Sequence, residues 1–304
     1  MFSNVSSMVV FEIILGVYSL AFGGIPLLYF KWENQRRPKQ PITEKLLRGP
    51  GEHAREEFAK LEDKFLDAYA QWIMVFLLFV GLMPILVRLL PSPWQIAALI
   101  ISAVFLAGWM GRFLFSVYER FQEARNYRLG YFGERLVAEQ LDPLRERGYR
   151  IFHDVPCTRK GRPFNIDHVV VSRLGIYAIE TKTRRKNDHQ ANRNAPRNVI
   201  VYDGEQIALP DWAGTDYLDQ AQGNGSWLES HLREELGLNV KVLPILTFPF
   251  WWVEGGNSTP NKVLVCNPGQ LHGLIPAKPT ARLSDRDFDS IVRVLDKLCR
   301  KVEY

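Results

Sequence analysis

Three long apolar stretches near the start of the chain constrain its fold more than any other feature. They cover about residues 8–30, 68–90 and 94–116 and carry almost no charge. Each is long enough, at roughly twenty residues, to cross the hydrocarbon core of a bilayer. The second and third could instead form a buried helical hairpin of a soluble protein, but such helices seldom stay uncharged for so long. We therefore predict an all-α transmembrane region with three spans in residues 1–118.

The charges around these stretches predict an orientation. Residues 31–50 carry six Lys or Arg against two Glu, whereas residues 1–7 carry no charge. The positive-inside rule then places a basic loop, 31–67, in the cytoplasm and the N-terminus outside. Without basic residues before it, the first stretch is expected to be an anchor and not a signal peptide. The prediction is a multi-pass protein of the inner (cytoplasmic) membrane, with residues 119–304 in the cytoplasm.

The cysteines argue against a disulfide or zinc framework. There are three, Cys157, Cys266 and Cys299, and their spacing shows no pairs. We expect them to be small buried residues in a reducing compartment.

The remaining residues read as a domain of mixed helices and strands. Alternation, turn signals and apolar periodicity predict helices and strands in a definite order. The expected elements are a helix at 118–148, a strand at 149–155, a loop at 156–163, a hairpin at 165–181, a hairpin at 198–209, a helix at 216–236, strands at 240–248 and 262–266, and a helix at 284–301. This order predicts an α/β domain with a mixed central sheet flanked by helices.

The hairpin "NIDHVVVSRLGIYAIETKT" (165–183) carries acids where a buried strand is normally apolar. If Val171 pairs with Ile176 across the turn, Asp167 falls directly opposite Glu180. Lys182 shares the face of Glu180, because side chains alternate along a strand. Two like charges opposed across a ladder destabilise it by a few tenths to about 1 kcal/mol, so a compensating partner is expected.

Two interpretations of this acidic pair remain open from spacing alone. A divalent cation suits carboxylate ligands, and Mg²⁺ in particular binds one or two of them and keeps several waters. Alternatively, the hairpin end is solvated and Lys182 neutralises one of the acids.

An Asp followed about a dozen residues later by Glu-x-Lys resembles the core of the PD-(D/E)xK nuclease superfamily. The wider order resembles one branch of it, the nuclease-related domain, NERD, over about residues 130–250. The motifs are "GERLVAEQLDPL" (133–144), "IDHVVV" (166–171), "GIYAIETKT" (175–183) and "DYLDQAQGNGSWLESHL" (216–232). Two departures are visible: Ile166 replaces the Pro of the superfamily's name, and "DYLDQ" replaces the usual Asn-Pro before Gln220.

The resemblance implies a restriction-endonuclease-like fold in a cytoplasmic domain, 119–304. It also implies hydrolysis of phosphodiester bonds in DNA with Mg²⁺ or Mn²⁺ as cofactor. The implied catalytic residues are Asp167, Glu180, Lys182, Glu134 and Gln220, and the implied metal ligands are Asp167, Glu180 and the backbone carbonyl of Thr181. Glu134 could equally be a surface or capping acid, and Gln220 an amide at a helix N-terminus. His168, whose side chain faces the other side of the sheet, is expected to be a hydrogen-bonded structural residue.

Two further segments could contact nucleic acid. The loop at 183–197 carries five basic residues against one Asp, which suits contact with phosphates, although a solvated loop is the alternative. Its basic residues are Arg184, Arg185, Lys186, Arg193 and Arg197. The segment "FPFWW" (248–252) could stack on bases, but such a cluster more often forms core or faces a membrane.

Our hypothesis from the sequence is a membrane-anchored, Mg²⁺-dependent DNA nuclease. Its expected partners are DNA and the lipid bilayer, with no small-molecule cofactor, and homo-oligomerisation is left open. The alternative is a non-catalytic nucleic-acid-binding or membrane scaffold module on the same fold, because a fold alone does not determine function.

Overall fold

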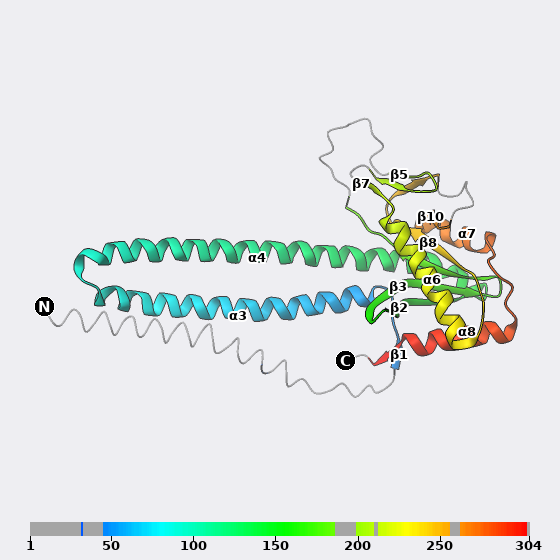
Figure 1. The fold of residues 1–304 in the computed structure, drawn as a ribbon, viewed down its shortest axis with the longest axis horizontal. Coiled ribbons are helices and arrows are strands. Elements are labelled where there is room, and N and C mark those ends of the chain that lie inside the picture. The colour runs from blue at the N-terminus through cyan, green and yellow to red at the C-terminus, as the bar shows by residue number, and fades with distance from the viewer. Residues whose placement is uncertain (1–31, 33–44, 186–198, 210–211, 256–261, 303–304) are drawn as a thin grey trace. The chain divides into compact units, whose positions relative to one another are not determined.

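The computed structural model describes Trp32 and residues 45–185, 199–209, 212–255 and 262–302 (Figure 1). The predicted first span, 8–30, lies outside these residues, as do Lys186, Arg193 and Arg197. The chain divides into two units, described in turn below: Met1–Pro41 with Phe58–Arg125, and Ile42–Glu57 with Asn126–Tyr304.

Two long helices, drawn in cyan to green in Figure 1, form the described part of the first unit. α3 covers Glu52–Leu89 and α4 covers Ser92–Leu141, and both continue into the second unit. The connection between them is too short for anything but an antiparallel pair. Aromatic rings pack between the helices, with ring centroids 4.1 Å apart for Trp72 and Trp109 and 5.3 Å apart for Phe79 and Phe105.

The most apolar parts of these helices face outward. Only 6% of the most apolar 18-residue stretch of α3, and none of the corresponding stretch of α4, is buried inside the protein. Both helices are long and apolar enough to cross a membrane. Helices in the core of a soluble protein bury such a face, so this exposure does not fit the alternative of a buried soluble hairpin.

α4 joins two elements that the sequence predicted separately. It runs without a break from the predicted third span through most of the predicted helix at 118–148, and a short helix, α5 (Pro143–Glu146), follows. Gly133 does not interrupt it and has a different role. A Cβ at this position would lie 2.0 Å from Cγ2 of Thr183, so the glycine lets α4 approach the chain just after the acidic hairpin.

The second unit is built on a five-stranded sheet of order β10-β8-β4-β3-β2. β2 (Arg150–Arg159), β3 (Arg162–Ser172) and β4 (Gly175–Thr181) are antiparallel, whereas β8 (Val242–Thr247) and β10 (Leu264–Cys266) add to β4 in parallel. The predicted mixed sheet flanked by helices, after long apolar helices, is therefore confirmed.

The loop predicted at 156–163 is wrong. β2 and β3 continue through it to a two-residue turn at Lys160 and Gly161, whose φ angles are 49° and 76°. Positive φ at both central residues is typical of tight hairpins. The polar composition of this ribbon, which is largely exposed, hid the strand pattern from the sequence.

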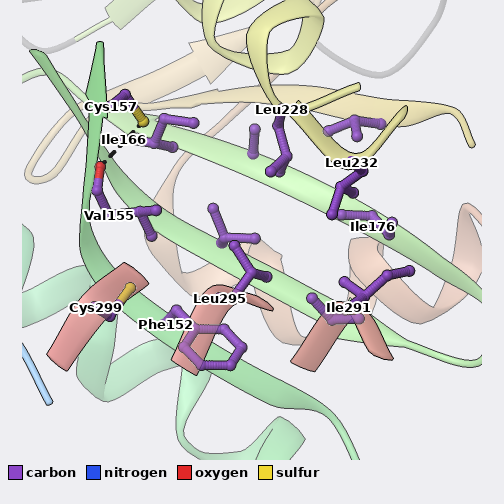
Figure 2. Packing of buried hydrophobic residues seen from close by; sticks show 14 of the residues in the cluster. Phe152, Val155, Cys157, Ile166, Ile176, Leu228, Leu232, Ile291, Leu295 and Cys299 are labelled. Atoms are coloured by element: carbon purple, nitrogen blue, oxygen red, sulfur yellow. Dashed lines mark hydrogen bonds between the residues drawn. The ribbon is translucent and has the colours of Figure 1, made fainter. Parts of the chain in front are cut away.

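Helices cover both faces of the sheet. α6 (Asp216–Leu236) and α8 (Asp285–Cys299) pack on one face, where Leu228, Leu232, Ile291 and Leu295 meet the sheet at Ile176 and its neighbours (Figure 2). The C-terminal part of α4, α5 and α7 (Leu271–Ala277) cover the other face. β4 is buried along its whole length, which explains its nearly continuous apolar sequence and makes its two polar C-terminal residues exceptional.

A second, four-stranded sheet has the order β7-β6-β5-β9, and its strands alternate along the chain with the last two strands of the main sheet. β5 (Val199–Tyr202) and β6 (Ile207–Leu209) form the predicted hairpin, and β7 (Trp212–Gly214) and β9 (Trp252–Glu254) extend it. The segment "FPFWW" is divided: Phe248 and Trp251 are buried in this core, whereas Phe250 and Trp252 are exposed.

A small pairing ties the start of the described chain to its end. β1 (Lys45–Leu47) is antiparallel to β11 (Arg300–Val302). Elsewhere in this unit, η2 (Pro268–Gln270) forms a single turn before α7. Residues 45–57 therefore belong to the second unit, whereas the sequence grouped them with the loop at 31–67 of the membrane region. Local patterns could not predict this, because the paired residues lie about 250 positions apart in the sequence.

Candidate functional site

The predicted register of the acidic hairpin is confirmed. Val171 pairs with Ile176, and the ladder continues to His168 and Ile179. The next step brings Asp167 opposite Glu180, and both side chains are buried. The backbone N–H of Thr181 donates to Oδ2 of Asp167 over 2.7 Å, which fixes this carboxylate against β4.

Three donors surround the Glu180 carboxylate. Lys182 Nζ lies 2.6 Å from Oε1, Gln220 Nε2 lies 2.7 Å from the same oxygen, and Asn224 Nδ2 lies 2.7 Å from Oε2. Gln220 and Asn224 are four residues apart on α6, so they lie on one face of the helix. The sequence analysis missed Asn224, although an amide one helical turn after Gln220 was the signal that could have found it.

Lys182 is held as a cation inside the site. Burial alone would lower its pKa, but the charge of Glu180, the hydrogen bond to it and the charge of Asp167 outweigh burial, so the pKa of Lys182 is raised above its ordinary value. Its Nζ also lies 5.7 Å from the ring centre of Tyr217, and its backbone N–H donates to the carbonyl of Thr247 on β8. The ammonium group is thus positioned by contacts on several sides.

Glu134 reaches the same region from α4. Its Oε2 accepts a hydrogen bond of 3.1 Å from the backbone N–H of Gly51. Burial, followed by the negative charges of Asp154 and Glu180, raises the pKa of Glu134 to about 8. The pKa of Asp167 is also raised well above its ordinary value, by burial first and then by Glu180 and Glu134. These acids therefore share one buried, electronegative environment.

Asp154 is a fourth acid, which the sequence analysis missed. It is completely buried on β2 with φ 47°, and the pairs His153–His168 and Val155–Ile166 on either side place it next to Asp167. Asp154, Asp167 and Glu180 thus occupy neighbouring positions on three adjacent strands. An acid inside the apolar strand "YRIFHDV" was the signal that could have found it.

His168 is confirmed as a buried, hydrogen-bonded residue. Its Nδ1 lies 2.9 Å from Nδ1 of His153, and Nε2 of His153 lies 3.1 Å from Nη2 of Arg145. Burial, followed by the proximity of His153, keeps the pKa of His168 well below its ordinary value. Neither histidine contacts the four acids through a hydrogen bond among the described residues.

Arg184 and Arg185 are the described members of the basic loop. Nη1 of Arg184 donates to the Tyr217 hydroxyl over 3.1 Å, and its carbonyl accepts from Nε1 of Trp251 over 3.3 Å. Since Tyr217 also lies beside Lys182, the beginning of the basic loop adjoins the acidic site.

The residues present fit a hard divalent cation held in part by water. Burial first, and then the neighbouring acids, raise the pKa values of Asp167 and Glu134, so their ionised forms are disfavoured without a positive partner. A carboxylate offers about four lone-pair positions, so the three hydrogen bonds to Glu180 leave room for another partner. Within the described ranges, no three His, Cys, Asp or Glu side chains are arranged as a ready-made metal centre. Carboxylate oxygens are suitable ligands for a hard cation such as Mg²⁺, which binds one or two of them and keeps several waters.

Comparison with known proteins identifies the domain that carries this site. Residues 129–249 match the family model described as the nuclease-related domain, NERD. A segment of 54 residues is 37% identical to an uncharacterized protein of Bacillus anthracis; it spans 17% of this chain and 26% of that protein. No solved structure matches the chain. The matched range contains Glu134, Asp154, Asp167, Glu180 and the two amides of α6. The chain therefore contains a nuclease-related domain of the NERD family at residues 129–249, as the sequence motifs predicted.

Proposed function

We propose that this protein is a membrane-anchored nuclease that hydrolyses phosphodiester bonds in DNA with Mg²⁺ or Mn²⁺. The observation that carries the proposal is the convergence of Asp167, Glu180 and Lys182 at one end of the β3–β4 hairpin. Two acids that can hold a cation, beside an amine that can meet a phosphate, are the groups this reaction requires.

Asp167 and Glu180 would hold the cation, together with the backbone carbonyl of Thr181 and water. A bound Mg²⁺ supplies a water of lowered pKa and offsets the negative charge of the scissile phosphate. Gln220 and Asn224 keep the Glu180 carboxylate in one orientation through their hydrogen bonds. Glu134, with its pKa raised to about 8, is mostly protonated near neutral pH in the metal-free protein. A cation bound beside it would favour the ionised carboxylate, which could then orient water at the site or accept a proton from it.

Lys182 would stabilise the charge that develops on the phosphate. Its amine is cationic and partly buried, and electrostatic stabilisation is strongest where water is excluded. Arg184 and Arg185 would contact the neighbouring DNA backbone, together with Lys186, Arg193 and Arg197 of the same loop. Phosphate contacts of this kind position the duplex without reading its sequence.

The membrane part of the proposal rests on the long, exposed apolar stretches of α3 and α4. We infer three spans, at about 8–30, 68–90 and 94–116, with the N-terminus outside and the nuclease-related domain in the cytoplasm. Lipid is the environment in which so much exposed apolar surface on two helices is favourable.

Cleavage assays on the full chain in nanodiscs, with plasmid, linear and single-stranded DNA, test the proposal. The wild type should cleave only with Mg²⁺ or Mn²⁺. Lys182→Ala should keep the increase in melting temperature caused by Mg²⁺ but lose about 10²-fold to 10³-fold in rate, because its contribution is to the transition state. Salt-sensitive DNA binding without cleavage under any of these conditions would instead support the non-catalytic binding module.

A further inference from the structure

Residues 45–57, called the strap below, contact the acidic site from outside the segment that matches the family model. The strap begins with β1, pairs with the end of the chain through β11, and continues into the first turn of α3. We propose that the strap completes the acidic site, with Gly51 and Arg48 as positioning residues for Glu134 and Asp154. This inference deepens the proposed nuclease function and rests on it.

Arg48 supplies the counter-charge for the most deeply buried acid. Its Nε donates to Oδ2 of Asp154 over 2.8 Å, and Nη2 contacts the same oxygen. The remaining carboxylate oxygen accepts from Nδ2 of Asn165 over 2.5 Å. The Asp154 side chain is fully buried, and a buried carboxylate without a cationic partner is strongly destabilising. Without the strap, Asp154 would add an uncompensated charge beside Asp167.

The position of Arg48 is itself fixed from several directions. Its backbone N–H donates to the carbonyl of Cys299 over 3.0 Å, directly after the β1–β11 pairing. Its Nη1 lies 3.3 Å from Oε1 of Glu56. The guanidinium group is therefore held by the strap and by α8, and does not depend on Asp154 alone for its orientation.

Gly51 holds the Glu134 carboxylate through its backbone. Its N–H donates to Oε2 of Glu134 over 3.1 Å, and this hydrogen bond favours the ionised carboxylate. The peptide lies at the N-terminus of α3, where backbone N–H groups are suited to an anionic partner. Glu134 is thereby directed by the strap toward the region of the other acids.

Only glycine can occupy position 51 in this arrangement. Its φ is +75°, and a Cβ there would lie 2.6 Å from Cδ2 of Tyr131, the ring that precedes Glu134 by less than one helical turn. Gly49 is a matched control in the same segment, because a Cβ at position 49 would meet no atom within 4 Å. Comparing alanine at position 51 with alanine at position 49 therefore distinguishes loss of the Gly51–Glu134 contact from a general effect of an added side chain on the strap.

The first experiment is a double-mutant cycle in the full chain in nanodiscs: wild type, Gly51→Ala, Glu134→Ala and the double variant. We expect Gly51→Ala to lower kcat for Mg²⁺-dependent DNA cleavage about tenfold, with KM for DNA unchanged, as loss of one hydrogen bond to a charged group predicts. On the Glu134→Ala background the same change should have less than about a twofold effect, because positioning acts through Glu134. Gly49→Ala should remain within about twofold of wild type.

A second measurement does not depend on cleavage. Hydrogen exchange of the strap amides should be at least about tenfold faster in Glu134→Ala than in wild type, since Gly51 loses its acceptor. Glu139→Ala, on an exposed position of the same helix, should leave the exchange unchanged. A third test is rescue: Arg48→Ala should lower the melting temperature, and adding Asp154→Asn should restore most of it, because the unpaired buried charge is removed.

The outcomes distinguish the inference from the proposed function. Additive effects of Gly51→Ala and Glu134→Ala, or strap exchange that does not respond to Glu134→Ala, would overturn the inference while an active wild type upholds the nuclease. A wild type that neither binds Mn²⁺ nor cleaves DNA would overturn the proposed function and, with it, the positioning role of the strap.

Discussion

The backbone N–H of Thr181 donates to the Asp167 carboxylate across 2.7 Å, just beyond His168 and Ile179, the last main-chain pair of β3 and β4. A side chain thus continues the ladder where the main chain stops. The same bond fixes a buried acid directly opposite Glu180, and Asp167 has a pKa well above its ordinary value because of burial and its acidic neighbours. Asp167 is therefore held in place by a hydrogen bond, while burial and the neighbouring acids disfavour its charged form.

Asp167→Asn should separate these two effects. The amide oxygen can still accept from Thr181, so the fold should persist, and removing one of two opposed charges should stabilise the metal-free protein by about 1 kcal/mol. For a domain of this size that is an increase of about 2–4 °C in melting temperature. The further increase caused by Mg²⁺ in wild type should disappear. Glu139→Gln is the control, and an equal Mg²⁺ effect in wild type and Asp167→Asn would show that Asp167 is not a ligand.

The two amides of α6 should contribute unequally to stability. Asn224 is buried and donates to Glu180 Oε2, whereas Gln220 is exposed and shares Oε1 with Lys182. Asn224→Ala should lower the free energy of unfolding by about 1.5–3 kcal/mol, as expected for a lost hydrogen bond to a charged group. Gln220→Ala should lower it by less than about 1 kcal/mol. Urea unfolding of both variants measures the difference, and equal losses would contradict the geometry.

The raised pKa of Glu134 predicts that the metal-free protein loses stability as pH rises. The folded-state pKa of about 8 lies above the unfolded value of 4.5, so the stabilising contribution is complete below pH 4.5 and is lost as pH rises through about 8. Between these values the folded state binds more protons than the unfolded state, and stability should fall by up to about 1.4 kcal/mol per pH unit for this group.

Melting temperatures between pH 6.5 and 8.5 in EDTA measure this dependence, and Glu134→Gln should reduce its slope. Mg²⁺ should raise the melting temperature more at pH 8 than at pH 6.5, because binding a cation to these acids releases protons. A melting temperature of the metal-free wild type that rises over this range would contradict the assignment.

The native cysteines are buried, so they should not react in a cysteine-labelling test of membrane topology. Cys157, Cys266 and Cys299 are all buried, and burial raises the pKa of the Cys266 and Cys299 thiols to about 12. A membrane-impermeant maleimide should therefore not label the wild type. In intact cells we expect Pro91→Cys, in the turn between α3 and α4, to be labelled at once, and Glu234→Cys, on the exposed face of α6, only after permeabilisation. The reverse pattern would invert the proposed orientation.

Several features followed from the sequence because they depend on residues close together along the chain. Alternation and a short turn fixed the register of β3 and β4, and thereby the opposition of Asp167 and Glu180. Apolar periodicity located α6 and α8, and the motifs around the acids and Lys182 carried the resemblance to the nuclease-related domain. Each of these signals is contained within a single helix or hairpin.

The rest of the site was decided by tertiary contacts. Asn224 reaches Glu180, and Arg48 reaches Asp154, only because α6 and the strap pack against the sheet. Gly51 is about eighty residues from the acid it contacts, and local sequence gives no indication of that pairing. A strand or helix pattern reports which face of an element is buried but not which distant element covers it. The sequence therefore determined which acids form the hairpin pair, and the packing of distant segments decided which residues hold and neutralise them.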